Sequence, residues 1–405
     1  CNSFKKLMIC GERRILYCNI NALNSVRNHI DFCFFSTRHF HIFTQQNFTD
    51  MKTFLFLILA VLFFPLKSFS QVDVTATSGT PAASYTNLTN TFIAINNGVH
   101  QGDIVITINS SNTNFFITLN ASGAGAASYS SIRIKPGAVG AINIDNSNSG
   151  SALFWFNGVD NLTIDGTLPG GYGPLTFRNP LSSNNYAVFH FFSNAQNDTL
   201  RNCVIQSNSG WCVVIANPST SYGNKNFYFS GNTFSNVSNI AFPQMGIYNN
   251  GQSDSITITN NYFENIVLNG STCGSIYSNA AASNWIVKNN YVYYSLPFTP
   301  ANATNIYGIY IPFTANTCQI SNNTIGFADT LQSSPAAFAS SAAVTFTGIT
   351  GSSAQYGTTI KKNVVDGFDF STGTAGNQYA GSWNGITYLP FYDNCYVDSN
   401  RVGKT

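Results

Sequence analysis

The feature that most constrains this chain is a repeat that places an asparagine at nearly regular intervals. The pattern is an apolar residue, two polar residues, asparagine, any residue and a second apolar residue, as in Ile258–Phe263. Its asparagines are Asn232, Asn261, Asn290, Asn323, Asn363 and Asn400. Counted from Cys203, which takes the asparagine position in an earlier copy, the intervals are 29, 29, 29, 33, 40 and 37 residues. A constant unit with variable insertions is typical of solenoids, in which each repeat packs on its neighbours.

A second signature lies ten residues before the first apolar residue of the repeat. The aligned residues are Phe154, His190, Tyr248, Tyr277, Tyr310 and Thr387. Longer connections near Val214 and Phe346 interrupt the rule. We therefore expect three short strands per repeat: one ending near the aligned residue, one such as Ser255–Ile258 and one such as Tyr262–Ile266. A sharp turn at Asn260–Asn261 would separate the last two, because asparagine tolerates the left-handed backbone conformation.

Stacking these repeats would bring the asparagines into one column. Strands that pair in successive repeats lie about 4.7–4.9 Å apart, so one asparagine per coil would form a ladder of amide hydrogen bonds. A buried amide without partners costs about 1–3 kcal/mol, and the ladder would therefore also fix the register. Alternating apolar residues such as Ile256 and Ile258 would fill the interior. The pattern predicts an all-β solenoid.

Three short strands per coil, with asparagine at the turn between the second and third, resemble the right-handed parallel β-helix family typified by pectate lyases. The resemblance covers residues 103–405. Coils of 29 residues do not fit a β-propeller, which needs about 40–45 residues for four strands, and hexapeptide periodicity of a left-handed β-helix is absent. The resemblance implies the fold. It does not imply an activity, because this fold carries lyases, hydrolases, adhesins and inert stalks.

The N-terminal region has the pattern of an export signal. Met51 and Lys52 precede the apolar run Phe54–Phe64, and small residues at Ser68 and Ser70 precede Gln71. We interpret residues 51–70 as a cleaved signal peptide rather than a membrane anchor, since a spanning helix needs about 20 apolar residues. Residues 1–50 are then an upstream segment translated in error. The chain stops within a repeat, so we expect the β-helix to be truncated at its C-terminal end.

Residues 71–102 are expected to cap the first coil, whose exposed strand edges would otherwise pair with other chains. Ser84 could begin a helix that runs to about Asn97, with one apolar face and Gly98 as its stop. That face consists of Leu88, Phe92 and Ile95. The segment Val72–Gly79 with this helix resembles the N-terminus of secreted surface proteins of Bacteroidetes-type bacteria. The resemblance implies a secreted or outer-surface location, with membrane contact only through a C-terminal sorting or anchoring domain.

Composition excludes several other functions. From Gln71 onward there are 10 Lys and Arg against 13 Asp and Glu, a net charge of −3, so no basic face for nucleic acid is expected. The five cysteines of this region are odd in number and form no C-x-x-C pair, which argues against a disulfide scaffold or a zinc site. We expect all five to be free and to pack as small apolar residues. They are Cys203, Cys212, Cys273, Cys318 and Cys395.

No complete catalytic group is recognisable. Arg133-Ile134-Lys135 is similar to one motif of polygalacturonase-like hydrolases, but the accompanying Asn-Thr-Asp, Asp-Asp and His-Gly elements are missing. We therefore interpret it as part of a strand. A Ca²⁺ site needs six to eight oxygen ligands, and the carboxylate pairs of this chain, Asp160 with Asp165 and Asp366 with Asp369, fall at expected turns. We predict no catalytic residue, metal or cofactor.

The candidate ligand-binding residues are the aromatic members of the second signature, His190, Tyr248, Tyr277 and Tyr310, together with Phe154. If Ile247, Ile276 and Ile309 point inward, alternation turns the aromatic rings outward. Such a row suits sugar rings, because each side chain offers an apolar body and a polar group. A ladder that only stabilises the stack is the alternative, and a lone histidine among phenylalanines is more often a packing residue.

These observations favour a secreted or cell-surface β-helix that binds polysaccharide or a host or biofilm surface in adhesion. Two alternatives remain open. One is a polysaccharide lyase or glycoside hydrolase with active residues in further coils, and the other is a passive stalk.

Overall fold

The structure is a computed structural model, and the part of the chain that it describes lies in the compact unit Ser68–Thr405. The predicted signal peptide, the upstream segment and Cys395 lie outside the described residues. The residues described are 71–137, 140–147, 152–168, 175–181, 186–208, 210–216, 223–239, 241–268, 271–298, 302–311, 317–338, 344–353, 357–369, 382–390 and 396–403.

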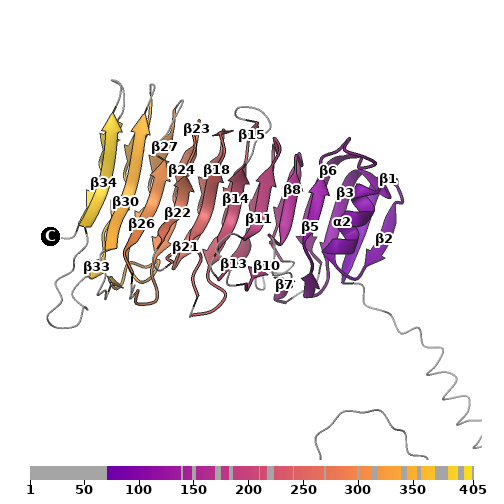
Figure 1. Cartoon of the computed structure of the whole chain (residues 1–405), viewed down its shortest axis with the longest axis horizontal. Helices are drawn as coiled ribbons and strands as arrows, with labels where there is room; N and C mark the ends of the chain where they lie inside the picture. Colours follow the sequence, from indigo (N-terminus) through magenta and orange to yellow (C-terminus); the bar gives the residue numbers. More distant parts are fainter. Residues whose placement is uncertain are drawn as a thin grey trace, which may run out of the picture. The chain divides into compact units, whose positions relative to one another are not determined.

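Three sheets form the β-helix, and each coil contributes one strand to each sheet (Figure 1). Sheet A comprises, in spatial order, β2 (Ala82–Tyr85), β1 (Val72–Gly79), β3 (His100–Ile108), β6 (Tyr129–Pro136), β9 (Leu162–Asp165), β12 (Thr199–Arg201), β16 (Tyr228–Ser230), β20 (Thr257–Thr259), β24 (Ile286–Lys288), β27 (Gln319–Ser321), β31 (Thr359–Lys361) and β35 (Tyr396–Asp398). Sheet B comprises β4 (Asn112–Asn114), β7 (Ile142–Asn146), β10 (Leu175–Asn179), β13 (Cys203–Ser207), β17 (Thr233–Ser235), β21 (Tyr262–Glu264), β25 (Tyr291–Tyr293), β28 (Thr324–Ile325), β32 (Val364–Val365) and β36 (Arg401–Val402).

Sheet C comprises β5 (Ile117–Asn120), β8 (Phe154–Asn157), β11 (Ala187–Phe192), β14 (Trp211–Ala216), β18 (Met245–Asn250), β22 (Thr272–Ser278), β26 (Thr304–Ile311), β30 (Val344–Ser353) and β34 (Ser382–Pro390). Two small sheets lie in the connections. They are formed by β15 (Asn224–Lys225), β19 (Ser253–Asp254) and β23 (Ala282–Ser283), and by β29 (Ala336–Ala337) and β33 (Phe368–Asp369).

Strands of successive coils pair in parallel and in a constant register. Ile258 of β20, for example, lies opposite Phe229 of β16 and Val287 of β24. This pairing confirms the predicted all-β parallel β-helix with three strands per coil. Antiparallel pairing occurs where β1 pairs with β2 and β3 at the N-terminal edge of sheet A.

The interior is filled by columns of apolar side chains, one residue per coil. On sheet A, Phe229, Ile258 and Val287 are each at most 1% exposed. On sheet B, the rings of Phe234 and Phe263 stack with their centroids 4.7 Å apart. The columns join in one continuous core that extends from the N-terminal strands to Val365. This stacking explains why the spacing of apolar residues in the sequence follows the coil rather than a helix.

The asparagine ladder runs through the turn between sheets A and B. The Nδ2 of Asn232 donates to Oδ1 of Asn261 at 3.0 Å, and Asn261 donates to Asn290 at 3.1 Å. The same contact joins Asn290 to Asn323, Asn323 to Asn363 and Asn363 to Asn400, each at 2.9 Å. The side-chain amide also donates to the sheet A strand of the preceding coil, as from Asn261 to the Phe229 carbonyl at 3.0 Å.

The residue before each ladder asparagine takes the left-handed conformation that the turn requires. Its φ is 55° at Asn260 and 57° at Asn289, and even Lys362 has a φ of 55°. Asparagine is favoured at this position because its short polar side chain tolerates a positive φ. The ladder asparagine itself then faces the interior, where Asn261 is fully buried.

The predicted cap is present, but its helix begins later than expected. Helix α2 spans Leu88–Asn96, and its N-cap is Asn87, which accepts a hydrogen bond from the Asn90 amide at 2.9 Å. Ser84, the predicted cap residue, lies in β2 and donates to Asp73. Strands β1 and β2 were not predicted from the sequence, and Ser84 takes part in their pairing instead of capping the helix. The predicted apolar face was correct: its residues Leu88, Phe92 and Ile95 are fully buried.

Four cysteines confirm the expectation of small buried apolar residues. Cys203, Cys212, Cys273 and Cys318 are free and buried. Burial raises the pKa of the Cys273 thiol to about 12, so it stays protonated at neutral pH. None of the helical segments in the described residues has the length and apolarity that crossing a membrane requires.

Candidate functional site: an aromatic strip on sheet C

Outward-facing aromatic side chains line up along sheet C, but the membership differs from the prediction. Phe154 points inward and is 1% exposed, and Trp155 is the residue in register with His190. Phe346 is likewise buried, and Thr350 is in register with Tyr310. The ten-residue offset therefore misplaced the outward position of β8 by one residue, because the connection after Trp155 is one residue shorter.

The first aromatic group covers β8 and β11. The centroid of the Trp155 indole lies 4.8 Å from the His190 ring and 5.3 Å from Phe192. Phe116, from the turn before β5, packs edge-on against Trp155 at 5.5 Å and 85°. Both rings that contact the indole edge-on come from surface positions, so this group forms a partly exposed aromatic cluster.

The second aromatic group covers β14, β18, β22 and β26. The ring centroid of Trp211 lies 5.2 Å from that of Tyr248, and the centroids of Tyr248 and Tyr277 are 6.0 Å apart. Tyr277 stacks on Tyr310 at 4.5 Å and 15°, and Tyr307 contacts both of these rings. The two groups meet through Val214, a buried outward residue of β14 that packs in one cluster with Trp155, Trp211 and Tyr248.

We call these side chains together the aromatic strip. It consists of Phe116, Trp155, His190, Phe192, Trp211, Tyr248, Tyr277, Tyr307 and Tyr310. From β8 to β26 it crosses six strands of sheet C, a distance of about 24 Å at the usual strand spacing. His190, Tyr248, Tyr277 and Tyr310 of the predicted set all lie in it.

Trp155 was missed because of the one-residue difference in the connection after it, whereas Trp211 and Tyr307 were missed because their strands break simple alternation. In β18 both Gly246 and Ile247 face inward: a Cβ at Gly246 would lie 2.6 Å from the Phe263 ring, and Ile247 is fully buried. Two consecutive inward residues give each strand outward positions on both sides of the pair. The recurring glycine before Ile-Tyr was the available signal.

A glycine also shapes the surface under the strip. A Cβ at Gly274 would lie 2.9 Å from Cβ and Cδ2 of Tyr277. Because Gly274 has no side chain, the Tyr277 ring can lie over the backbone of its own strand, beside Tyr307 of the next strand. Any larger residue at this position would displace the ring.

Side-chain amides border the strip. The Tyr248 hydroxyl donates to Oδ1 of Asn250 at 3.1 Å, and Nδ2 of Asn279 donates to the same oxygen at 3.5 Å. Farther along sheet C, Asn157 donates to Asn120 at 3.4 Å. Apolar ring surfaces and amide groups thus lie side by side on this face.

Burial dominates the electrostatics of the strip. It lowers the pKa of His190 to about 4, so the imidazole is neutral at physiological pH. It also raises the pKa of Tyr248, Tyr277 and Tyr307, whose hydroxyls stay protonated. The strip is therefore uncharged across the physiological range.

The charged residues that sequence analysis considered serve other contacts. Arg133 lies on strand β6, and Asp165 Oδ2 accepts from Arg133 at 3.3 Å and from Arg201 at 2.7 Å. These contacts fit the interpretation of Arg133-Ile134-Lys135 as strand residues. Within the described ranges, His, Cys, Asp and Glu side chains form no group of three or more that could hold a metal ion.

Asp198 is a buried carboxyl near a second one. Burial raises its pKa well above the ordinary value, and the nearby Asp160 carboxylate raises it further, although the Leu162 amide donates to it at 2.8 Å. Since the folded pKa exceeds 3.8, its ordinary value, stability falls as the pH rises above that value.

We therefore expect Asp198→Asn to raise the free energy of unfolding at pH 7 by about 1–2 kcal/mol, because the amide keeps the acceptor for Leu162 without a charge. Urea unfolding at pH 4 and pH 7 measures this gain, which should shrink at pH 4. The exposed Asp398→Asn serves as the control. Equal stability of Asp198→Asn and the unmodified protein at pH 7 would contradict the expectation.

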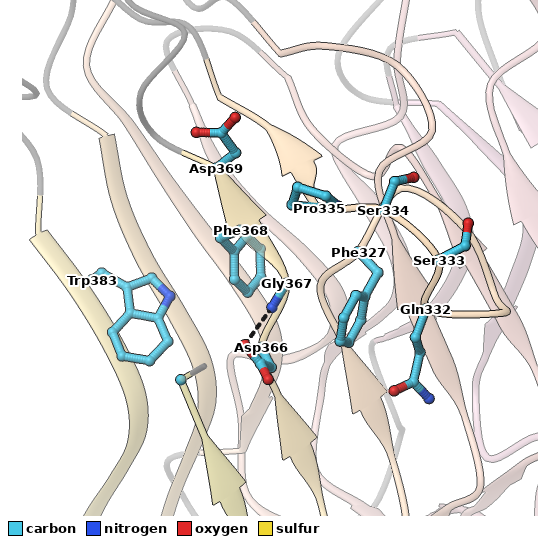
Figure 2. A pocket seen from close by; sticks show the side chains of 11 residues that line it. Phe327, Gln332, Ser333, Ser334, Pro335, Asp366, Gly367, Phe368, Asp369 and Trp383 are labelled. Atoms are coloured by element: carbon cyan, nitrogen blue, oxygen red, sulfur yellow. Dashed lines mark hydrogen bonds between the residues drawn. The ribbon is translucent and has the colours of Figure 1, made fainter. Parts of the chain in front are cut away.

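A pocket with a volume of about 500 Å³ lies at the last described coils (Figure 2). Its walls include Phe327, Phe368 and Trp383, and Asp366, which accepts from the Gly367 amide at 2.7 Å and pairs with Arg401 at 3.5 Å. Trp383 is in register with the buried Phe346, so it belongs to an inward-facing column. The pocket therefore opens onto the core columns of this coil, unlike the aromatic strip, which lies on an outer face.

Comparison with known proteins gives no family. No protein-family model and no curated protein matches the chain. Among solved structures, the chain is similar to the Streptococcus pneumoniae surface protein and adhesin PfbA, with 10% sequence identity, a TM-score of 0.28, and coverage of 78% of this chain and 94% of that one. A TM-score this low does not support a shared fold, so the β-helix assignment rests on the strand pairing described above.

Proposed function

We propose that the protein is an exported or cell-surface β-helix that binds an extended, neutral polysaccharide along the aromatic strip and so acts in adhesion. The observation that carries the proposal is the partly exposed, uncharged row of aromatic rings bordered by amides on sheet C. Sugar rings have apolar faces and hydroxyl edges, and they suit a surface on which aromatic rings are bordered by amide groups.

The spacing of the strip supports an extended ligand. Successive rings come from successive strands, which lie about 4.8 Å apart, close to the length of one pyranose residue. A polymer that lies across the strands would present a similar group to each coil. Export and the surface location are part of the proposal, supported by the signal-like pattern of residues 51–70.

The test is the double variant Tyr248→Ala/Tyr277→Ala. Loss of two aromatic contacts, each contributing about 1 kcal/mol, should weaken polysaccharide binding at least about tenfold. Affinity electrophoresis in gels that contain neutral or uronic-acid polysaccharides measures this, with circular dichroism as a check on folding. We expect no release of reducing or unsaturated ends from the same polymers.

Tyr262→Ala/Tyr291→Ala is the matched control. These two tyrosines stack at 5.5 Å on the outer face of sheet B, away from the strip. Equal weakening by both double variants would show that binding does not depend on sheet C. A lack of binding to all the polymers would favour the passive stalk instead, and turnover would favour the lyase or hydrolase.

A further inference from the structure

One contact in the aromatic strip combines two buried polar atoms that have no partner. Among the described residues, Nε1 of Trp155 and Nε2 of His190 are both buried and both without a hydrogen bond. The two residues are in register on the adjacent strands β8 and β11, and their ring centroids are 4.8 Å apart. Buried polar groups are nearly always hydrogen-bonded, so two neighbouring exceptions on the candidate ligand face need an explanation.

The chemistry of the two atoms is complementary. The indole Nε1–H is a donor only, and the neutral imidazole can accept at Nε2 when its proton is on Nδ1. A hydroxyl group satisfies both, because it accepts one hydrogen bond and donates another. A carboxylate or an ether can accept from the indole but has no proton to donate to Nε2.

We propose that Trp155 and His190 form the specificity-determining subsite of the aromatic strip, where one sugar hydroxyl accepts from Trp155 Nε1–H and donates to His190 Nε2. This inference rests on the proposed polysaccharide binding and deepens it by naming a neutral, hydroxyl-bearing sugar at this position. A polymer with a carboxylate or an ether at this position binds less well.

The subsite opens by movement of Phe116. The ring of Phe116 packs edge-on against the Trp155 indole, and it is 38% exposed in a turn between β4 and β5. Phe192, the other ring that packs edge-on against the indole, belongs to strand β11 itself. Phe116 is therefore the side chain that a sugar can displace with the smaller loss of packing, and Phe116→Ala should strengthen binding.

The experiment compares Trp155→Phe and His190→Phe, which keep aromatic rings but remove the donor or the acceptor. The matched control is Tyr291→Phe on sheet B, which also keeps a ring and removes a polar group but lies outside the strip. The probes are the β-1,4-linked hexamers of glucose, mannose and N-acetylglucosamine, each in its native and its O-methylated form. Isothermal titration calorimetry should show binding of the best native hexamer weakened about tenfold or more by each subsite variant and little changed by Tyr291→Phe. For the methylated hexamer, the variants and the unmodified protein should bind alike.

A second readout follows the indole N–H directly. The chain has 4 tryptophans, and the Trp155→Phe variant identifies which indole ¹⁵N–¹H signal belongs to Trp155. That signal should shift downfield when the native hexamer binds. Subsite variants that bind as tightly as the unmodified protein would overturn this inference and leave the strip as the binding surface. Failure of the unmodified protein to bind any hexamer would overturn both proposals.

Discussion

Asn261→Ala should lower the free energy of unfolding by about 4 kcal/mol, because it removes the centre of the asparagine ladder. Asn261 Oδ1 accepts from both the backbone amide and the side-chain amide of Asn232, each at 3.0 Å. The Asn261 side-chain amide also donates to the Phe229 carbonyl and to Asn290. Alanine leaves the Asn232 amide and the Phe229 carbonyl buried without these partners. Urea unfolding followed by tryptophan fluorescence measures the loss.

The control for this variant is Asn305→Ala in β26. Asn305 is exposed on a strand of sheet C, and its substitution should change stability by at most about 0.5 kcal/mol. If Asn261→Ala were as mild as Asn305→Ala, the ladder would not be a source of stability. A change in the slope of the unfolding curve would instead indicate that coils unfold separately.

The contribution of His190 to stability should fall as the pH decreases from about 6.5 to about 4, because His190 is held neutral in the fold. Burial lowers its folded pKa from 6.5 to about 4, so the unfolded chain takes up the proton first. The stabilising effect is complete above pH 6.5 and is lost as the pH falls through this window, up to about 3 kcal/mol. Chemical unfolding at half-unit pH steps tests this.

His190→Phe isolates the effect, since phenylalanine keeps an aromatic ring beside Trp155 and cannot titrate. The difference in stability between the unmodified protein and this variant should change by about 2–3 kcal/mol between pH 7 and pH 4. Asp198 acts in the opposite direction in both proteins and cancels in the difference. A difference that is constant with pH would show that His190 reaches solvent in the fold.

The length and position of each coil from Asn232 onward could be predicted from the sequence because every such coil contains one ladder asparagine. An asparagine that must be buried, hydrogen-bonded and adjacent to a left-handed residue leaves a fixed local pattern, as at Asn260–Asn261. Apolar residues such as Ile258 then place the strands on either side. These requirements concern neighbouring residues, and the same short pattern therefore recurs in each repeat.

The details of the binding face were less predictable, because they depend on how long each connection is. The offset that correctly located Tyr248 and Tyr277 failed at Phe154, where the connection is one residue shorter. Alternation failed where Gly246 and Ile247 both face inward, since the close approach of Phe263 that requires glycine is a contact between two sheets across the interior. The cap helix begins later than predicted for the same kind of reason. Ser84 pairs with β1, and the residues around Ser84 give no sign of this pairing.

The direction of the hydrogen bonds has a mechanical consequence. In all three sheets, and in the asparagine ladder, they join one coil to the next. A tensile force between the N-terminal cap and the last coil would therefore load the coils in series, and the weakest would open first. An opened coil of 29 residues, the spacing of Asn232 and Asn261, would release about 100 Å of extended chain. A tether built in this way would lengthen in steps under load and would keep the remaining coils folded.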